Sequence, residues 1–112
     1  MRAWRVHELG DPSKVMSLDE VEQPTPGEGQ VLVKVRAAAL NFPDVLMAMG
    51  MYQEKPPLPY TPGVELCGEI VETGQRVIGS PSNGPGAFAE YALMDKDFAF
   101  PAPEGLSDEK AA

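Results

Sequence analysis

Proline and glycine occur so often in this chain that they limit it to short secondary-structure elements. The 112 residues include 12 prolines and 11 glycines, which interrupt helices and strands and mark turns. Several of the stretches between them alternate between apolar and polar side chains, the pattern of a half-buried strand. The distribution of these two residue types therefore favours many short strands joined by turns.

The clearest strand candidate is "VLVKVRAAAL", where Val31, Val33 and Val35 share one face and Lys34 and Arg36 share the other. The segments "RAWRVHEL", "MSLDEVE" and "AFAEYALM" alternate in the same way, with "GDPS" as a turn after the first, and "CGEIVE" with "RVIG" indicates a hairpin. In "RAWRVHEL" the pattern places Trp4 and Val6 on the same face. We predict a mainly β fold, an antiparallel barrel or sandwich with one or two short helices, formed by residues 1–112 as one domain.

Two segments predict the helices. In "NFPDVLMAMG" we expect Pro43 at the first helical position, Asp44 near the positive end of the helix dipole, and Gly50 at the end. Asn41 precedes this helix, where it either caps free backbone amides or presents them to a polar ligand; the sequence alone favours the cap. Ser107 is expected to begin a second helix, of which the sequence includes only about one turn.

Charge and cysteine content exclude several classes of protein. The net charge is -8, whereas proteins that bind nucleic acid or anionic membranes need a basic surface. A single cysteine allows no internal disulfide and fits a reducing compartment. No apolar run approaches the ~18 residues of a membrane span. We therefore expect a cytoplasmic protein that binds neither nucleic acid nor membranes.

The residues also argue against metal or nucleophilic catalysis. A catalytic zinc ion needs three protein ligands, but the chain has one cysteine, Cys67, in an apolar stretch, and one histidine, His7, on the polar side of a strand. The serines of "SPSNGPG" have no histidine nearby, and no Gly-x-Gly-x-x-Gly motif follows a strand and opens a helix. We expect Cys67 to be a small buried residue and the chain to hold no metal.

The order of the motifs resembles a known family. The segments "NFPDVL", "GMYQEKPPLPYTPGVELCGEIVE", "RVIG", "GAFAEYALM" and "FPAPEGLSDEKAA" are similar to the amino-terminal GroES-like domain of the medium-chain dehydrogenase/reductase superfamily, particularly its zinc-free NADPH:quinone oxidoreductases. The resemblance implies a GroES-like irregular antiparallel barrel that forms one wall of an active-site cleft. It implies a Rossmann cofactor domain as the other wall, expected beyond the connecting helix at which this chain ends, and a homodimeric parent protein.

The resemblance also implies roles for residues in "LNFPDVLMAMGMYQEK". In zinc-dependent relatives a cysteine stands at the position of Asn41 and a histidine at that of Val64, so only Glu65 remains of that ligand set and no zinc is implied. Asn41 and Asp44 are the implied contacts of NADPH. Tyr52 is the implied substrate contact and catalytic candidate.

An apolar substrate pocket completes this expected site. The resemblance assigns it to Leu46, Met47 and Met51, although typical quinone oxidoreductases often carry an aromatic residue where this chain has Leu46. The implied function is the substrate-side domain of an NADPH-dependent oxidoreductase that reduces quinones or other conjugated carbonyls, including enones, without a metal.

Two alternatives remain open. "NFPDVL" and "GMY" also resemble the enoyl reductase domains of polyketide and fatty acid synthases, which act on enoyl thioesters. A different possibility is a non-catalytic barrel or binding module, because the sequence contains no cofactor domain. In either reading, we expect the 112 residues alone to bind NADPH poorly and to expose an unusually apolar surface toward the missing domain.

Overall fold

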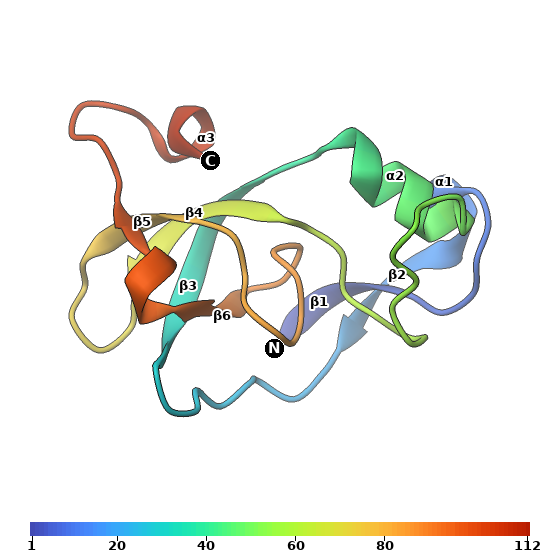
Figure 1. The fold of residues 1–112 in the computed structure, drawn as a ribbon, viewed down its shortest axis with the longest axis horizontal. Helices are drawn as coiled ribbons and strands as arrows, with labels where there is room; N and C mark the ends of the chain where they lie inside the picture. Colours follow the sequence, from blue (N-terminus) through green and yellow to red (C-terminus); the bar gives the residue numbers. More distant parts are fainter.

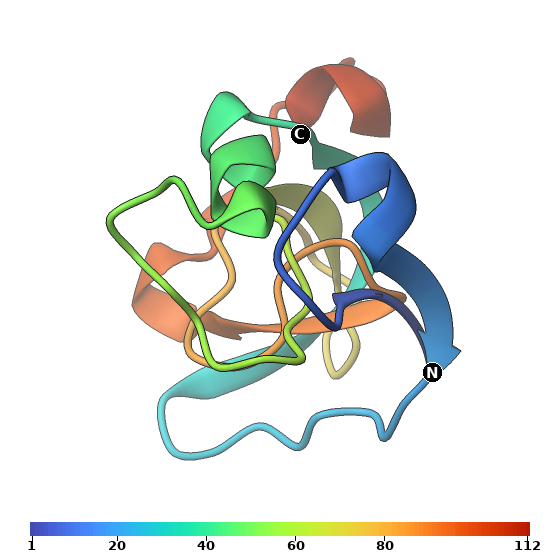
Figure 2. The same ribbon diagram turned by 90° about the vertical axis from the view of Figure 1, so that its right-hand side faces the viewer.

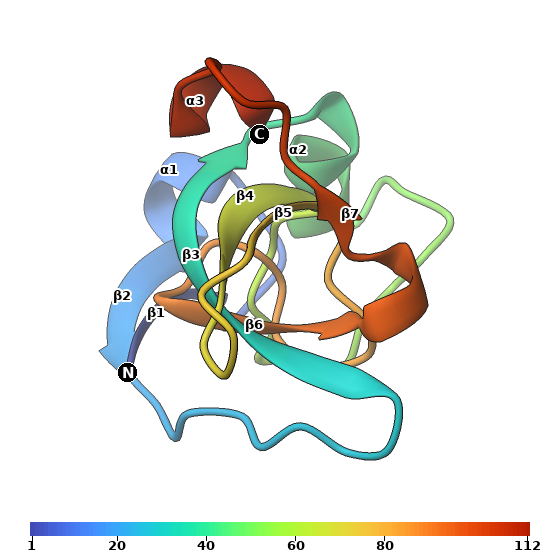
Figure 3. The same cartoon turned by 90° about the vertical axis from the view of Figure 1, so that its left-hand side faces the viewer.

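The computed structural model describes residues 1–112 and contains two antiparallel sheets (Figure 1). The smaller sheet pairs β1 (Arg2–Val6) with β2 (Met16–Glu20). The larger has the strand order β6-β3-β4-β5-β7 and consists of β3 (Gln30–Ala39), β4 (Glu65–Ile70), β5 (Arg76–Gly79), β6 (Tyr91–Asp95) and β7 (Phe100–Pro101). Figure 3 shows these strands curving around a common interior. The predicted mainly β antiparallel architecture is confirmed.

Short helices connect the strands. They are α1 (Pro12–Val15), α2 (Phe42–Met49), α3 (Asp108–Ala111) and the single 3-10 turn η1 (Lys96–Phe98). The predictions of α2 and α3 are confirmed, although α2 begins at Phe42, so that Pro43 is its second residue. The expectation that "GDPS" is only a turn is wrong, because Asp11 accepts a hydrogen bond from the backbone of Ser13 and caps α1. None of the helices combines the length and apolar character that crossing a membrane requires.

Strand β3 lies between β4 and β6 and carries the centre of the core. Val33 pairs with Ile70 on one side and with Ala92 on the other. The core consists of Val33, Leu66, Ile70, Val77, Ala87, Ala92 and Met94, with Val31 and Val35 packed against it. The valine face predicted from alternation is therefore the face that meets the core. Burial of these apolar side chains supplies the main driving force for the fold.

The first strand differs from its sequence pattern. Alternation places Trp4 and Val6 on the same buried face, but Ala3 and Val6 are buried and Trp4 is 44% exposed. Trp4 instead faces a groove of about 760 Å³ between the two sheets, which Leu18 and Phe88 also line. The smaller sheet thus packs through the short side chain of Ala3, and the indole of Trp4 lies at the groove.

The connection from α2 to β4, residues 50–64, has no regular helix or strand, yet main-chain hydrogen bonds fix its second half. Tyr60 exchanges two of them with Val6, with N to O distances of 2.8 and 3.2 Å. The backbone of Thr61, Pro62 and Gly63 accepts bonds from residues 86–88. Figure 2 shows this yellow-green connection running from α2 along the side of the molecule. Its attachment to two distant segments fixes the point at which β4 begins.

Gly68 should be a strong determinant of stability. A Cβ atom at Gly68 would lie 2.4 Å from the Lys34 carbonyl oxygen and 2.6 Å from Val33 Cγ1. We expect Gly68→Ala to lower the free energy of unfolding by about 1–3 kcal/mol, because the added methyl group forces β3 and β4 apart. Thermal unfolding followed by circular dichroism measures the effect.

The matched control is Gly27→Ala. A Cβ atom at Gly27 would lie 3.4 Å from the movable Gln30 side chain, an ordinary contact. This variant should unfold at nearly the same temperature as the unchanged protein. Equal melting temperatures for the two alanine variants would contradict the close approach of β3 and β4 at Gly68.

Candidate functional site

The candidate site lies at the first turn of α2, just beyond the ends of the β3–β4 pair. Ala39, the last residue of β3, pairs with Glu65, the first residue of β4. This register brings the next polar residue along the chain, Asn41, to Glu65, and Asn41 Nδ2 donates a hydrogen bond to Glu65 Oε2 over 3.1 Å. Two residues far apart in the sequence therefore share one hydrogen bond at the surface.

Asp44 fixes Asn41 from the other side. Its Oδ2 accepts a hydrogen bond from the Asn41 backbone N–H over 2.8 Å, and its own N–H donates to the Asn41 carbonyl over 3.0 Å. Asp44 is only 3% exposed, and a carboxylate in the first turn also complements the helix dipole. The predicted positions of Asn41 at the N-cap and of Asp44 near the start of the helix are confirmed. The favoured role of the Asn41 side chain as a cap is not, because that side chain makes no capping hydrogen bond and donates to Glu65 instead.

The sequence analysis missed one residue with a buried polar group, Tyr60. Asp44 Oδ1 and the Tyr60 hydroxyl are both buried without a hydrogen-bond partner. Burial raises the pKa of Tyr60, and the charge of Asp44 raises it further. Nothing in "PPLPYTPG" distinguishes Tyr60 from a tyrosine that covers a proline turn, so no local signal marks it.

Apolar side chains surround the polar centre of the site. Leu40 and Phe42, on either side of Asn41, are each 72% exposed, and Met51 is 67% exposed. Whether this face is more apolar than an ordinary protein surface stays a prediction. Such a surface around a polar residue is typical of a face that binds a ligand or another domain.

The remaining expected site residues lie on α2 and in the connection that follows it. Leu46 and Met47 are half-buried on α2, and Met47 lines a pocket of about 560 Å³ together with Tyr60. Tyr52 is half-buried in the connection after α2 and makes no hydrogen bond through its side chain. Only Asn41 and Asp44 are joined directly.

The arrangement suits a neutral polar group within an apolar surrounding. The Asn41 side chain retains an amide oxygen as an acceptor while its nitrogen donates to Glu65. The carboxylates of Asp44 and Glu65 disfavour a phosphate group at this helix terminus. No cluster of three or more His, Cys, Asp or Glu side chains could hold a metal ion.

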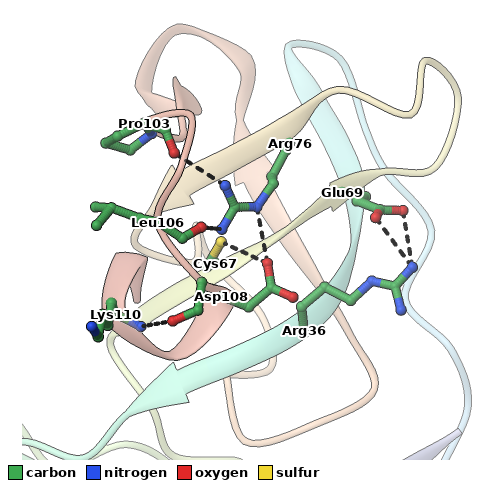
Figure 4. A network of polar contacts seen from close by, with 9 residues as sticks. Arg36, Cys67, Glu69, Arg76, Pro103, Leu106, Asp108 and Lys110 are labelled. Carbon is green, nitrogen blue, oxygen red and sulfur yellow. Dashed lines mark hydrogen bonds and ion pairs between the residues drawn. The ribbon is translucent and has the colours of Figure 1, made fainter.

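Cys67 belongs to a separate structural network that holds the C-terminal segment (Figure 4). Arg76 Nε donates to Asp108 Oδ1 over 2.9 Å, while its two terminal nitrogens donate to the carbonyl oxygens of Pro103 and Leu106 over 3.2 and 2.7 Å. Asp108 Oδ1 also accepts a weak bond from Cys67 Sγ over 3.6 Å. The prediction that Cys67 is a small buried residue is confirmed.

Comparisons with known proteins agree with this architecture. Residues 27–104 match the family model of the alcohol dehydrogenase GroES-like domain. The chain is 38% identical over 120 residues to a quinone oxidoreductase from Lama guanicoe, covering 100% of this chain and 36% of that protein. It thus spans little more than a third of the length of this curated relative.

Solved structures give the same result. The quinone oxidoreductase from Thermus thermophilus, also solved in complex with NADPH, is 35% identical with a TM-score of 0.84, over 99% of this chain and 35% of that chain. The quinone oxidoreductase from Coxiella burnetii is 30% identical with a TM-score of 0.91, over 100% and 40% of the two chains.

The environment of Cys67 predicts a slowly reacting thiol. Burial raises the pKa of Cys67, so less of the reactive thiolate is present at a given pH. At pH 8, a thiol reagent should label the folded protein at least roughly tenfold more slowly than the protein unfolded in guanidinium chloride. Absorbance of the released thionitrobenzoate measures both rates.

A variant tests whether the network of Asp108 causes this protection. Asp108→Ala removes the carboxylate that joins α3 to Arg76 and Cys67, so labelling of the folded protein should accelerate. Rapid labelling of the unchanged folded protein would contradict the buried position of Cys67.

Proposed function

Because the chain belongs to the alcohol dehydrogenase GroES-like domain family, we propose that it forms the substrate-side domain of an NADPH-dependent oxidoreductase that reduces quinones or other conjugated carbonyls by hydride transfer. The observation that carries this proposal is the similarity to quinone oxidoreductases along the whole chain, 38% identity over 100% of it for the Lama guanicoe protein. The relative from Thermus thermophilus has been solved with NADPH. This similarity includes every residue of the candidate site.

The complete protein, in this proposal, adds a Rossmann domain that binds the phosphate groups of NADPH, forms homodimers largely through that domain and acts in the cytoplasm. The negative charge at the site supports this division of the cofactor between two domains. Asp44 and Glu65 lie at the only polar centre described above, where they would repel the pyrophosphate. The uncharged carboxamide of the nicotinamide fits beside Asn41, whereas the charged half of the cofactor does not.

Asn41 orients the nicotinamide. NADPH, when bound, supplies the hydride, and the chain's own residues position its ring. Because Asn41 Nδ2 donates to Glu65, the side-chain oxygen is the part of the amide that accepts a hydrogen bond from the carboxamide. Asp44 holds the Asn41 backbone, so both parts of this residue are fixed before the cofactor arrives and little conformational entropy is lost on binding.

The apolar residues shape the acceptor site and exclude water. Leu46, Met47 and Met51 form the wall against a flat substrate, and Tyr52 contacts its carbonyl oxygen. The proposal requires no zinc: of the ligand set found in zinc-dependent relatives only Glu65 is present, and its carboxylate accepts the bond from Asn41. A quinone is sufficiently electrophilic to accept hydride when it is held against the ring.

Substrate turnover tests the proposal. The complete protein should oxidise NADPH with 1,4-benzoquinone as acceptor, followed by absorbance of NADPH, and metal analysis should find no stoichiometric zinc. Faster turnover of a crotonyl thioester would favour the enoyl reductase alternative. Turnover of neither acceptor would leave the chain a non-catalytic module, and tight NADPH binding by the 112 residues alone would contradict the need for a second domain.

A substitution tests the role of Asn41. Asn41→Ala removes the amide that orients the carboxamide, so kcat/KM for NADPH should fall by roughly tenfold, the effect of losing one to two hydrogen bonds. The matched control is Gln75→Ala, which removes an exposed side-chain amide from the β4–β5 hairpin and should leave the constants unchanged. Equal kinetic constants for the unchanged protein and Asn41→Ala would remove Asn41 from the site.

A further inference from the structure

A pocket of about 560 Å³, lined mainly by polar side chains, adjoins the candidate site. Val64, which lines it, directly precedes Glu65, whose carboxylate accepts the hydrogen bond from Asn41. Met47, which the proposed function places in the wall of the acceptor site, lines the same pocket. Its volume is within the roughly 300–1,000 Å³ of small-molecule sites. An acceptor held against this wall therefore has the polar pocket beside it.

The groove between the two sheets also reaches the candidate site, through Leu40, but its lining is mainly apolar. It would suit an alkyl substituent, whereas a polar pocket loses hydrogen bonds to water when such a chain fills it. None of the three residues that form the proposed acceptor wall lines the groove. The position of Met47 therefore favours the polar pocket as the space for a substituent of the acceptor.

The polar pocket combines two carboxylates with uncharged polar side chains. The carboxylates are those of Glu54 and Asp95, and no Lys, Arg or His lines the pocket. The uncharged polar side chains are those of Gln30, Tyr60, Thr61, Ser80, Ser82 and Asn83. Carboxylates repel an anionic substituent, whereas they accept hydrogen bonds from a hydroxyl group. The lining therefore suits an uncharged substituent that can both donate and accept hydrogen bonds.

Neighbouring residues fix Ser82 within this lining. Its Oγ accepts a hydrogen bond from Gln30 Nε2 over 3.0 Å, and Gln30 is held in turn because its Oε1 accepts from the Gly27 N–H over 2.9 Å. The Ser82 N–H donates to the Leu93 carbonyl over 2.8 Å. A serine hydroxyl that already accepts one bond has its own hydrogen available for an oxygen atom of a ligand.

We propose that this pocket takes a short, uncharged, hydroxyl-bearing substituent of the acceptor, and that Ser82 determines the preference for it. The oxygen of the substituent accepts a hydrogen bond from Ser82, and its hydrogen is donated to another oxygen of the pocket. An alkyl chain of the same length leaves these polar groups without partners, and sites built for hydrogen bonding discriminate against such a ligand. The inference rests on the proposed function for the ring and names the substituent that the ring carries.

Two acceptors of equal length test the preference. With the complete protein and NADPH, hydroxypropyl-1,4-benzoquinone should have a kcat/KM roughly tenfold above that of butyl-1,4-benzoquinone, the effect of one to two hydrogen bonds. Carboxyethyl-1,4-benzoquinone, which is anionic at neutral pH, should be the poorest of the three acceptors. Equal constants for the hydroxypropyl and butyl compounds, or faster turnover of either of the other two, would overturn the proposal.

A variant separates the hydroxyl of Ser82 from general effects. Ser82→Ala should lower kcat/KM for the hydroxypropyl compound by roughly three- to tenfold and leave that for the butyl compound unchanged, so that the ratio between them falls. The matched control is Ser17→Ala, which removes an exposed hydroxyl from β2 and should preserve the ratio. An unchanged ratio in Ser82→Ala would overturn the role of Ser82.

Binding without turnover distinguishes this inference from the proposed function. Hydroxypropylbenzene carries the same substituent on a ring that does not accept hydride. In two-dimensional NMR of the complete protein it should shift the Ser82 amide, whereas butylbenzene should not. Such a shift in a protein that reduces no quinone would refute the proposed function and leave the preference of the pocket intact. Turnover of benzoquinone without a shift at Ser82 would refute the role of the pocket alone.

Discussion

The antiparallel pairing of β3 with β4 decides where the candidate site forms. Ala39 opposite Glu65 is the last pair of the ladder, and Asn41 follows two residues later. A shift of one residue would turn every side chain of one strand to the opposite face. Gly68 restricts such a shift, because β3 approaches it too closely for any side chain. The hydrogen bond between Asn41 and Glu65 is therefore a consequence of strand register.

The site is carried by a helix that cannot be stable alone. Helix α2 has eight residues, below the ~12–15 at which an isolated helix becomes marginal. Its ends are fixed by hydrogen bonds from neighbouring residues: Asp44 holds Asn41 at the start, and Gly50, in a left-handed conformation, donates to carbonyls of the last turn. Gly10 adds a bond to the carbonyl of Ala48. These contacts, and not helix propensity, position Asn41.

Sequence reasoning was reliable where the signal is local and failed where it depends on partners distant in the chain. Alternation identifies the core face of β3, and the residues around Asn41 and Gly50 predict both ends of α2 within one residue. The contact of Asn41 with Glu65 depends on register, which spacing alone does not show. Tyr60 is invisible for the same reason, since the burial of its hydroxyl comes from packing between segments distant in the chain. Trp4 fits the alternating pattern of a strand, but it lies at a groove and not in the core, because Ala3 is the residue that packs inward.

The distribution of charge explains how such a ligand-poor domain serves the proposed chemistry. A dinucleotide brings several negative charges, and a chain with a net charge of -8 and two carboxylates at its polar centre is poorly suited to bind them. The same centre is well suited to the uncharged ring, which needs one oriented amide and a dry surrounding. Leu40 and Phe42 supply that surrounding only when another domain covers them, because both are 72% exposed. In the proposed function, the part of this domain is then to orient and desolvate the ring, while the attraction for the cofactor comes from the proposed Rossmann domain.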